Sequence, residues 1–421
     1  MKTDVRLEHQ LLAVETEHAV HAMLELTAPP AATASARLPL NLVLVIDRSG
    51  SMAGPKLETT KECAAFLVRR LGPTDSLSVV AYDDEVRLVS PLGALGDRQD
   101  VLRAIGGIQP GGQTNLSGGW LKGVEELKRA QAHGPRTVLL LTDGLANVGV
   151  VDPSSLVAMA GSARGEGIGT TTIGYGDGFN EDLLTGMADA GGGNAHYAGT
   201  TDEAPGIFAS EFEGLMSVVA QNLSVEIRPS DQVKLLGVLN EYPSVPVPGG
   251  VQVQLGDAYA DETRRVVFEL HVPELSALGV AKVADIVVRY VSVGEQIAAH
   301  EVTVPVTVNL VSADDASASQ ADREVVEEIV VLKAARARDE ARKAAESGDF
   351  ERAKTVLGAM ATELRAIAPG SAKARELLED AEQLESHAMG MTALGFTPGA
   401  AKAMKYQSHS TRRGRRPPRR S

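Results

Sequence analysis

Two short, uninterrupted apolar runs constrain the fold of this 421-residue chain more than any other feature. The first is NLVLVID at residues 41–47, and the second is RTVLLLTDG at residues 136–144. Runs of this length without polar alternation are typical of strands buried on both faces of a parallel sheet. Each run ends at or next to an aspartate. We therefore expect two buried strands that deliver carboxylates to one edge of the same sheet.

Helical and strand-like segments alternate between residues 38 and 216. Residues 76–83 and 86–90 are separated by two acidic residues, which predicts a hairpin at one sheet edge. GIGTTTIGYG and NAHYAG are further strand candidates. The expected helices cover residues 56–71, 97–105, 117–133, 153–164 and 180–190. This alternation predicts an α/β domain with a doubly wound, mostly parallel, Rossmann-like sheet.

The sequence becomes rich in β-strand patterns from residue 217 to residue 312. Runs such as RRVVFELHVP and HEVTVPVTVNL are interrupted by Pro and Gly, which predicts a β-sandwich. Residues 20–27 near the N-terminus alternate in the same way, and a lone strand is not stable by itself. We therefore expect residues 1–37 to pair into the sandwich, with the α/β domain inserted between the two pieces.

The C-terminal part of the chain changes character twice. Ala, Glu, Arg and Leu recur at helical spacing over residues 318–390, and SGDF (347–350) predicts a helical hairpin followed by a further helix. The last twenty residues carry eight Lys and Arg side chains and no acid. We expect residues 391–421 to be a disordered basic tail. Binding to nucleic acid, to anionic lipid or to the chain's own acidic face is the alternative.

Composition limits the classes of partner. The formal net charge is −14, and it becomes −22 without the eight cations of the tail, so the body repels phosphate backbones. Aromatic residues make up 4%, which argues against a specific nucleic-acid surface. No apolar run approaches the roughly 18 residues of a membrane span. Cys63 is the single cysteine and no secretory leader is evident, so we expect a cytoplasmic protein.

Three fragments combine oxygen-bearing side chains: DRSGS (47–51), GGQTNLSGG (111–119) and LTDG (141–144). The first and third follow the two buried strands. In a doubly wound sheet these strands are neighbours, and their carboxyl ends form the crevice where such sheets bind ligands. Hydroxyl and carboxylate oxygens suit Mg²⁺, with Mn²⁺ or Ca²⁺ as alternatives. The fragments contain no histidine or cysteine, which argues against a soft metal.

Together these fragments resemble the metal-ion-dependent adhesion site of von Willebrand factor A (VWA) domains. Integrin inserted domains and inter-α-trypsin-inhibitor heavy chains share the pattern, and GYGDGFNEDLL and GGGNAHY look like parts of stand-alone bacterial A domains. The resemblance implies that Ser49, Ser51 and Thr114 ligate the cation through their hydroxyls. It implies that Asp47 and Asp143 hold the water molecules of the cation or contact the residues that ligate it. The resemblance leaves the partner open. We expect a protein that offers an Asp or Glu carboxylate, because ligation by hydroxyls leaves the cation attractive to an external carboxylate.

The function expected from this pattern is non-enzymatic, metal-dependent protein binding. A metal-dependent hydrolase is one alternative, but no His, Lys or second carboxylate pair accompanies the fragments as a general base. The VWA subunit of a larger ATPase-containing assembly is another. The ATPase would then be a separate chain, because no GxxxxGK[ST] motif is present. GxSxG and GxGxxG motifs are absent as well.

Two features near the fragments have alternative interpretations. Asp83, Asp84 and Glu85 could add negative potential at the rim of the site, or they could form a polar hairpin turn. The glycines around Thr114 could let its loop approach the cation and shift, or they could mark a loose surface loop.

Overall fold

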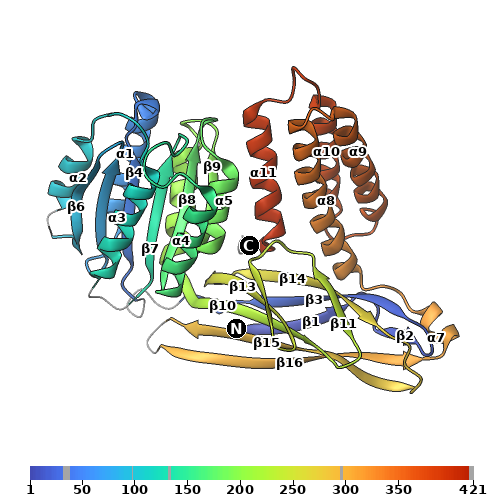
Figure 1. The fold of residues 1–421 in the computed structure, drawn as a ribbon. Coiled ribbons are helices and arrows are strands. Elements are labelled where there is room, and N and C mark those ends of the chain that lie inside the picture. Colours follow the sequence, from blue (N-terminus) through green and yellow to red (C-terminus); the bar gives the residue numbers. More distant parts are fainter. Residues whose placement is uncertain (32–37, 97, 131–133, 294–296, 417–421) are drawn as a thin grey trace.

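A computed structural model describes residues 1–31, 38–96, 98–130, 134–293 and 297–416. The chain forms an α/β domain, a β-sandwich and a group of C-terminal helices (Figure 1). The sandwich lies along one end of both other parts, and helix α11 stands between the α/β domain and the remaining C-terminal helices (Figure 1). Among the residues described, no helix combines the length and apolar character needed to cross a bilayer.

The sheet of the α/β domain has the strand order β6-β5-β4-β7-β8-β9. All neighbours are parallel except β5 and β6, which form the predicted antiparallel hairpin at the edge. The two apolar runs are the adjacent central strands β4 and β7, and the expected α/β class is confirmed. The strands are β4 (Asn41–Asp47), β5 (Ser76–Tyr82), β6 (Val86–Ala94), β7 (Arg136–Thr142), β8 (Ile168–Tyr175) and β9 (Gly192–Ala198).

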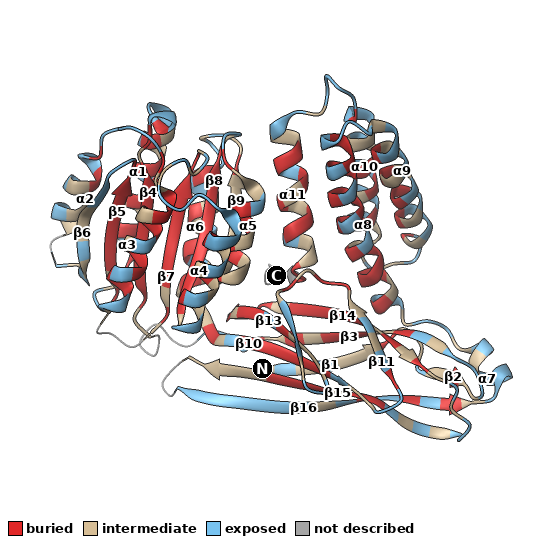
Figure 2. Cartoon of the chain, in the orientation of Figure 1, coloured by how far each residue is buried: buried red, intermediate tan, exposed pale blue. Residues whose placement is uncertain are grey.

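Helices cover both faces of this sheet. Every residue of β4 is buried (Figure 2). Leu44 and Ile46 pack on the side of α1, α2 and α6, whereas Val43 and Val45 pack on the side of α3, α4 and α5. This explains why the strand has no polar alternation. The helices are α1 (Pro55–Arg70), α2 (Arg98–Gly106), α3 (Leu116–Lys128), α4 (Pro153–Gly165), α5 (Glu181–Ala190) and α6 (Ala204–Met216).

The β-sandwich combines strands from both ends of the chain. One sheet has the order β1-β3-β14-β11, and the other has the order β12-β13-β10-β15-β16-β2. β3 pairs antiparallel with β14 from Thr27↔Thr263 to His18↔Val272, so the α/β domain is inserted within the sandwich sequence. The strands are β1 (Lys2–Leu7), β2 (Leu11–Ala13), β3 (His18–Thr27), β10 (Val218–Pro229), β11 (Lys234–Val238), β12 (Ser244–Val247), β13 (Gly250–Tyr259), β14 (Thr263–Val272), β15 (Gly279–Ser292) and β16 (Ala298–Val311).

Three long helices follow a short helix, α7 (Ala313–Ala318). They are α8 (Arg323–Glu346), α9 (Phe350–Ile367) and α10 (Ala374–Gly390). The break between α8 and α9 falls at SGDF, where the side chain of Asp349 accepts a hydrogen bond from the amide of Arg352 and so caps α9. The predicted helical hairpin is therefore confirmed. α8, α9 and α10 share a core that includes Leu357, Leu364 and Leu384.

The expectation of a disordered tail over residues 391–421 is wrong for most of its length. Residues Pro398–Arg412 form helix α11, with Thr397 accepting a hydrogen bond from the amide of Ala400. Arg415–Arg416 form a short strand, β17, that pairs with β14. Composition misleads here because Pro398 occupies the first turn of a helix, where proline is favoured, and because the basic side chains have acidic partners. Residues 417–421 lie outside the described part.

Candidate metal site at the carboxyl edge of the sheet

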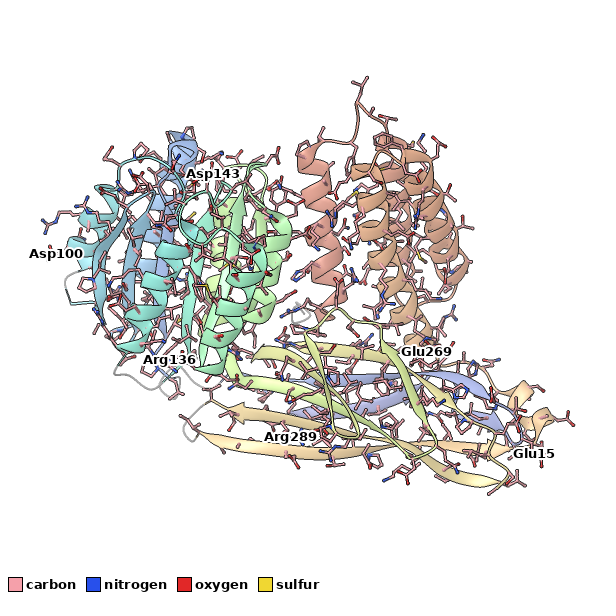
Figure 3. The ribbon with its side chains drawn as sticks, viewed as in Figure 1. Glu15, Asp100, Arg136, Asp143, Glu269 and Arg289 are labelled. Carbon is pink, nitrogen blue, oxygen red and sulfur yellow. The ribbon has the colours of Figure 1, made fainter. Side chains whose placement is uncertain are left out.

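The predicted site lies where β4 and β7 end. Asp47 is the last residue of β4, and Asp143 directly follows the last residue of β7. Figure 3 shows Asp143 at one end of the sheet, opposite Arg136, which begins β7. Because β4 and β7 are parallel neighbours, both aspartates reach the same edge. Gly54, with a φ of 83°, then turns the chain from this edge into α1.

Three hydroxyls gather at the two aspartates. Ser49 Oγ lies 3.2 Å from Ser51 Oγ, and Ser51 Oγ donates a 2.6 Å hydrogen bond to Asp143 Oδ1. A β-carbon added to Gly144 would lie 3.3 Å from Thr114 Oγ1 and 3.5 Å from Ser51 Oγ, so these two hydroxyls approach the same point. The structure thus brings all five predicted residues of the site together.

Asp47 is fully buried, and both oxygens of its carboxylate accept hydrogen bonds. Its Oδ1 accepts a 2.8 Å hydrogen bond from the amide of Ser49, and its Oδ2 accepts a 2.6 Å hydrogen bond from the hydroxyl of Thr142. Burial raises the pKa of the Asp47 carboxyl above its usual range, and the charge of Asp143 raises it further. A carboxylate in this position is stabilised by a cation placed nearby.

Lys56 is part of the site, although the sequence analysis did not single it out. It lies in the first turn of α1, and its Nζ donates a 2.5 Å hydrogen bond to Asp143 Oδ2. Asp143 is fully buried, whereas about one third of the Lys56 side chain is exposed. The signal that could have revealed it is its place on α1, the helix that begins next to the DRSGS fragment. Lys56 supplies one positive charge where the two aspartates supply two negative charges.

The glycine-rich loop before Thr114 is held by the acidic hairpin. Asp83 accepts hydrogen bonds from Arg48 (2.8 Å) and from the amide of Gly112 (3.0 Å). A β-carbon at Gly111 would overlap the Asp83 carboxylate, which explains the glycine there. Asp84 accepts a hydrogen bond from the amide of Gln113. Hydrogen bonds therefore hold the loop in place, which argues against a loose surface loop. Asp83 binds an arginine and a backbone amide in addition to carrying a negative charge.

The donor set fits a hard divalent cation. Three neutral hydroxyls and two carboxylates provide the oxygen ligands that Mg²⁺ prefers. Within the described ranges, no group of three or more His, Cys, Asp or Glu side chains is arranged to hold a metal. The oxygen atoms that meet at this edge are the hydroxyls of Ser49, Ser51 and Thr114 and the carboxylates of Asp47 and Asp143.

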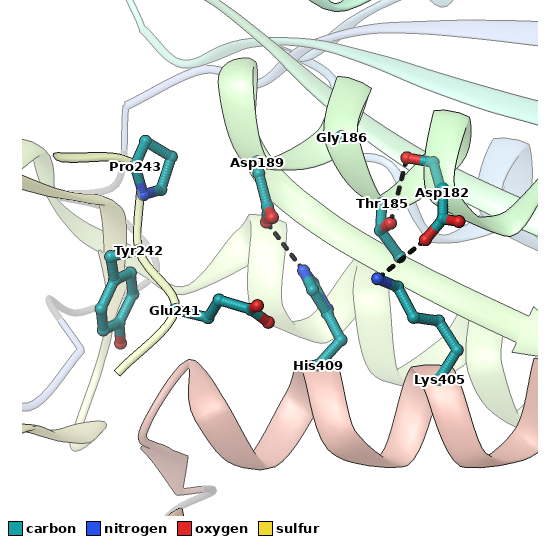
Figure 4. Close-up of a pocket in the computed structure, with 9 residues that line it drawn as sticks. All are labelled: Asp182, Thr185, Gly186, Asp189, Glu241, Tyr242, Pro243, Lys405 and His409. Carbon is teal, nitrogen blue, oxygen red and sulfur yellow. Dashed lines mark hydrogen bonds and ion pairs between the residues drawn. The ribbon is translucent and has the colours of Figure 1, made fainter. Parts of the chain in front are cut away.

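A second cluster of charged side chains lines a cavity away from the sheet edge. This cavity of about 330 Å³ lies between α5 and α11 (Figure 4). Its charged side chains bind one another: His409 Nε2 lies 2.8 Å from Asp189 Oδ1, and Lys405 Nζ lies 2.9 Å from Asp182 Oδ1 (Figure 4). Charges that are already paired give a ligand little to gain, so we assign this surface to the packing of α11.

Comparison with known families supports the interpretation of the α/β domain. The family model of the von Willebrand factor type A domain matches residues 41–209. A solved structure, a von Willebrand factor type A protein from Catenulispora acidiphila, aligns with a TM-score of 0.74 over 96% of each chain. Its sequence identity is 18%, so this likeness concerns the fold. Because it covers nearly the whole chain, it includes the sandwich and the C-terminal helices.

Curated relatives have similar sequences over part of their length. The protein sll0103 of Synechocystis sp. is 29% identical over 248 residues, which cover 57% of this chain and 59% of that protein. E3 ubiquitin-protein ligase WAV3 of Arabidopsis thaliana is 30% identical over 59% of this chain and 35% of the ligase. Human inter-alpha-trypsin inhibitor heavy chain H3 is 30% identical over 36% of this chain and 18% of its own length. The chain thus spans less than two thirds of each of these relatives, and their activities as whole proteins do not transfer to it.

Proposed function

We propose that this chain is a metal-dependent protein-binding module, because residues 41–209 match the family model of the von Willebrand factor type A domain. One divalent cation, Mg²⁺ or alternatively Mn²⁺ or Ca²⁺, is held by the hydroxyls of Ser49, Ser51 and Thr114. Asp47 and Asp143 lie behind these ligands and supply the negative charge. The observation that carries the proposal is the meeting of these hydroxyls in front of two fully buried carboxylates.

The charge of the site explains why a carboxylate is the expected ligand. Without a cation, Asp47, Asp143 and Lys56 give the site a formal charge of −1. A divalent cation changes this to +1, while its direct ligands remain neutral hydroxyls and water. An Asp or Glu side chain of a partner then gains a charge-assisted bond in a partly dry crevice, where such bonds are stronger than in open water.

Hydrolysis is the less favoured function for the same site. A metal-dependent hydrolase needs a base within hydrogen-bonding reach of the attacking water. The groups described in contact with the two aspartates are hydroxyls, the amide of Ser49 and the ammonium of Lys56. Hydroxyls and amides are weak bases, and Lys56 Nζ donates a hydrogen bond to Asp143 Oδ2 rather than accepting one. The arrangement therefore favours binding over catalysis.

The experiment is affinity capture from native lysate with the immobilised full-length chain. Wild type and Asp143→Ala are compared, each in Mg²⁺ and in EDTA, and bound proteins are identified by mass spectrometry. We expect a partner that is retained by wild type in Mg²⁺ alone, and that is lost when its acidic contact residue is replaced by the amide. A partner retained equally in EDTA, or equally by the variant, would overturn the proposal.

A further inference from the structure

The loop that follows Asp143 exposes an unusual set of apolar side chains. Leu145, Val150 and Val151 are 58%, 38% and 48% exposed. Among the described residues of the α/β domain, five large hydrophobic side chains are exposed, and these three lie within seven residues of one another. Single exposed apolar residues are common on protein surfaces, but a group beside a binding crevice is typical of an interaction surface.

Hydrogen bonds fix this loop to the N-terminus of α3. The amides of Asn147 and Val148 donate to the carbonyl of Thr114 at 3.1 and 3.3 Å. In return, the amide of Thr114 donates to Asn147 Oδ1 at 2.8 Å. The amide of Val150 donates to Ser117 Oγ at 2.9 Å. The apolar side chains therefore stand on an ordered loop that is bonded directly to one of the proposed metal ligands.

The charges around the crevice indicate what such a surface would bind. Its centre is cationic, since Lys56 is partly exposed there and a divalent cation adds to it. On the side of the β5–β6 hairpin, Asp84 and Glu85 are exposed and would repel further acidic residues. The loop after Asp143 offers apolar surface instead. A ligand that complements all three features carries one carboxylate beside an aliphatic side chain.

We propose that residues 145–151 form a specificity surface, which selects partner segments whose Asp or Glu is flanked by Leu, Ile or Val. This inference rests on the proposed function, because it assigns the surroundings of the carboxylate that the cation binds. Burial of one aliphatic side chain on this loop contributes about a tenfold gain in affinity. The carboxylate provides metal dependence, and the flanking residue provides selection among acidic segments.

The test uses three labelled peptides of defined sequence, GSGLDIGSG, GSGSDSGSG and GSGLNIGSG. Fluorescence polarisation measures their dissociation constants for the full-length chain in Mg²⁺ and in EDTA. We expect wild type to bind the aliphatic aspartate peptide about tenfold more tightly than the serine-flanked one, in Mg²⁺ alone. The double variant Leu145→Ser, Val151→Ser should lose this preference and keep its affinity for the serine-flanked peptide. Leu121→Ser, which alters a similarly exposed leucine on α3, is the matched control and should behave as wild type.

The outcomes separate the inference from the proposed function. Equal, metal-dependent affinity for both aspartate peptides would overturn the specificity surface and leave metal-dependent binding intact. Equal affinity for the aspartate and asparagine peptides, unchanged by EDTA, would overturn the proposed function itself. A second copy of this chain is the alternative occupant of the loop surface. Sedimentation of wild type and of the double variant tests for such a dimer. A dimer formed by wild type alone would show that the loop contacts a second copy of this chain, and would also overturn the inference.

Discussion

Two aspartates of the α/β domain have carboxylates with different partners: Asp47 is fully buried, whereas the side chain of Asp189 is 23% exposed. In the metal crevice, burial raises the pKa of Asp47, and the groups that contact its carboxylate are neutral. At the junction of α5 and α11, burial opposes the charge of Asp189 as well. There, however, Arg413 and His409 outweigh burial and hold the pKa of its carboxyl below the usual range. The first carboxylate still benefits from an added cation, and the second already has its cations.

Along the contact between α5 and α11, acidic side chains of α5 are paired with basic side chains of α11. On α11, Lys402 Nζ donates to the carbonyl of Phe179 at 2.7 Å and to Glu181 at 2.6 Å, and it lies 4.5 Å from the centre of the Phe179 ring. Tyr406 stacks on Tyr197, with ring centres 5.7 Å apart. The charges between α5 and α11 are paired and therefore belong to internal packing. The carboxylate of Asp47 has only neutral contacts, which is typical of a place for a ligand.

Truncation after residue 391 gives the largest expected effect, because it removes α11. It uncovers Phe179 and Tyr197, which pack against Tyr406, and it removes the basic partners of Glu181 and Asp189. We expect the free energy of unfolding to fall by about 3–5 kcal/mol, the usual range for breaking buried ion pairs. Urea unfolding followed by circular dichroism measures this. The control Arg375→Ala breaks a pair whose arginine is exposed on α10, and it should leave the free energy of unfolding nearly unchanged.

The same truncated chain tests whether the two regions are coupled. Phe179 is held by α11, and its neighbour Gly178 lies so close to Asp143 that an added β-carbon would be 2.5 Å from the Asp143 carbonyl oxygen. We expect Mg²⁺ affinity to fall when α11 is removed, at temperatures where the truncated chain is folded. Unchanged affinity would show that packing at the junction and metal binding are independent.

Lys56→Met changes the charge of the crevice itself. The substitution removes a cation that occupies Asp143 Oδ2, so we expect Mg²⁺ affinity to rise by about tenfold, which corresponds to about 1.4 kcal/mol. Calorimetric titration gives the dissociation constant. Lys61→Met is the matched control, since Lys61 belongs to the same helix and pairs with Glu58. Weaker binding by the Lys56 variant would mean that this lysine helps to hold the cation or its ligands.

The smallest expected effect is the pH dependence at the junction. The pKa of Asp189 is lowered in the folded chain, so the stability that it contributes is fully present above its unfolded pKa and is lost as pH falls through the folded value. Between pH 5 and pH 3 the free energy of unfolding should therefore fall more steeply for wild type than for Asp189→Asn. Parallel curves from urea titrations would contradict the pairing of Asp189 with Arg413 and His409.

The sequence indicates the metal crevice well because its elements follow strong local patterns. The apolar runs that end at Asp47 and next to Asp143 are typical of buried strands, and parallel neighbours place their carboxyl ends together. Lys56 and Thr142 were not anticipated, because their roles depend on how α1 and β7 pack in three dimensions. The hydrogen-bonding roles of Asp83 and Asp84 depend on the same kind of information, since a local pattern cannot show which distant backbone amides they accept from.

The error over residues 398–412 has a definite physical cause. Lys402, Lys405, His409 and Arg413 are spaced so that they face α5 when the segment is helical, and each has an acidic partner there. Read alone, the segment has few apolar residues and many positive charges, which is typical of disorder. Its helix is stabilised by partners more than two hundred residues away. The pairing of these basic residues with acidic residues of α5 can be recognised only after the fold is known.

The central claim is that hydroxyls and two buried aspartates at one sheet edge hold a single divalent cation. Calorimetric titration of Mg²⁺ and Mn²⁺ into wild type, Asp47→Ala and Thr114→Ala tests it most directly, with circular dichroism to confirm folding. We expect one cation per chain for wild type, no measurable binding for folded Asp47→Ala, and weakened binding for Thr114→Ala. Folded Asp47→Ala that binds either cation with wild-type affinity and stoichiometry would contradict the assignment of this site.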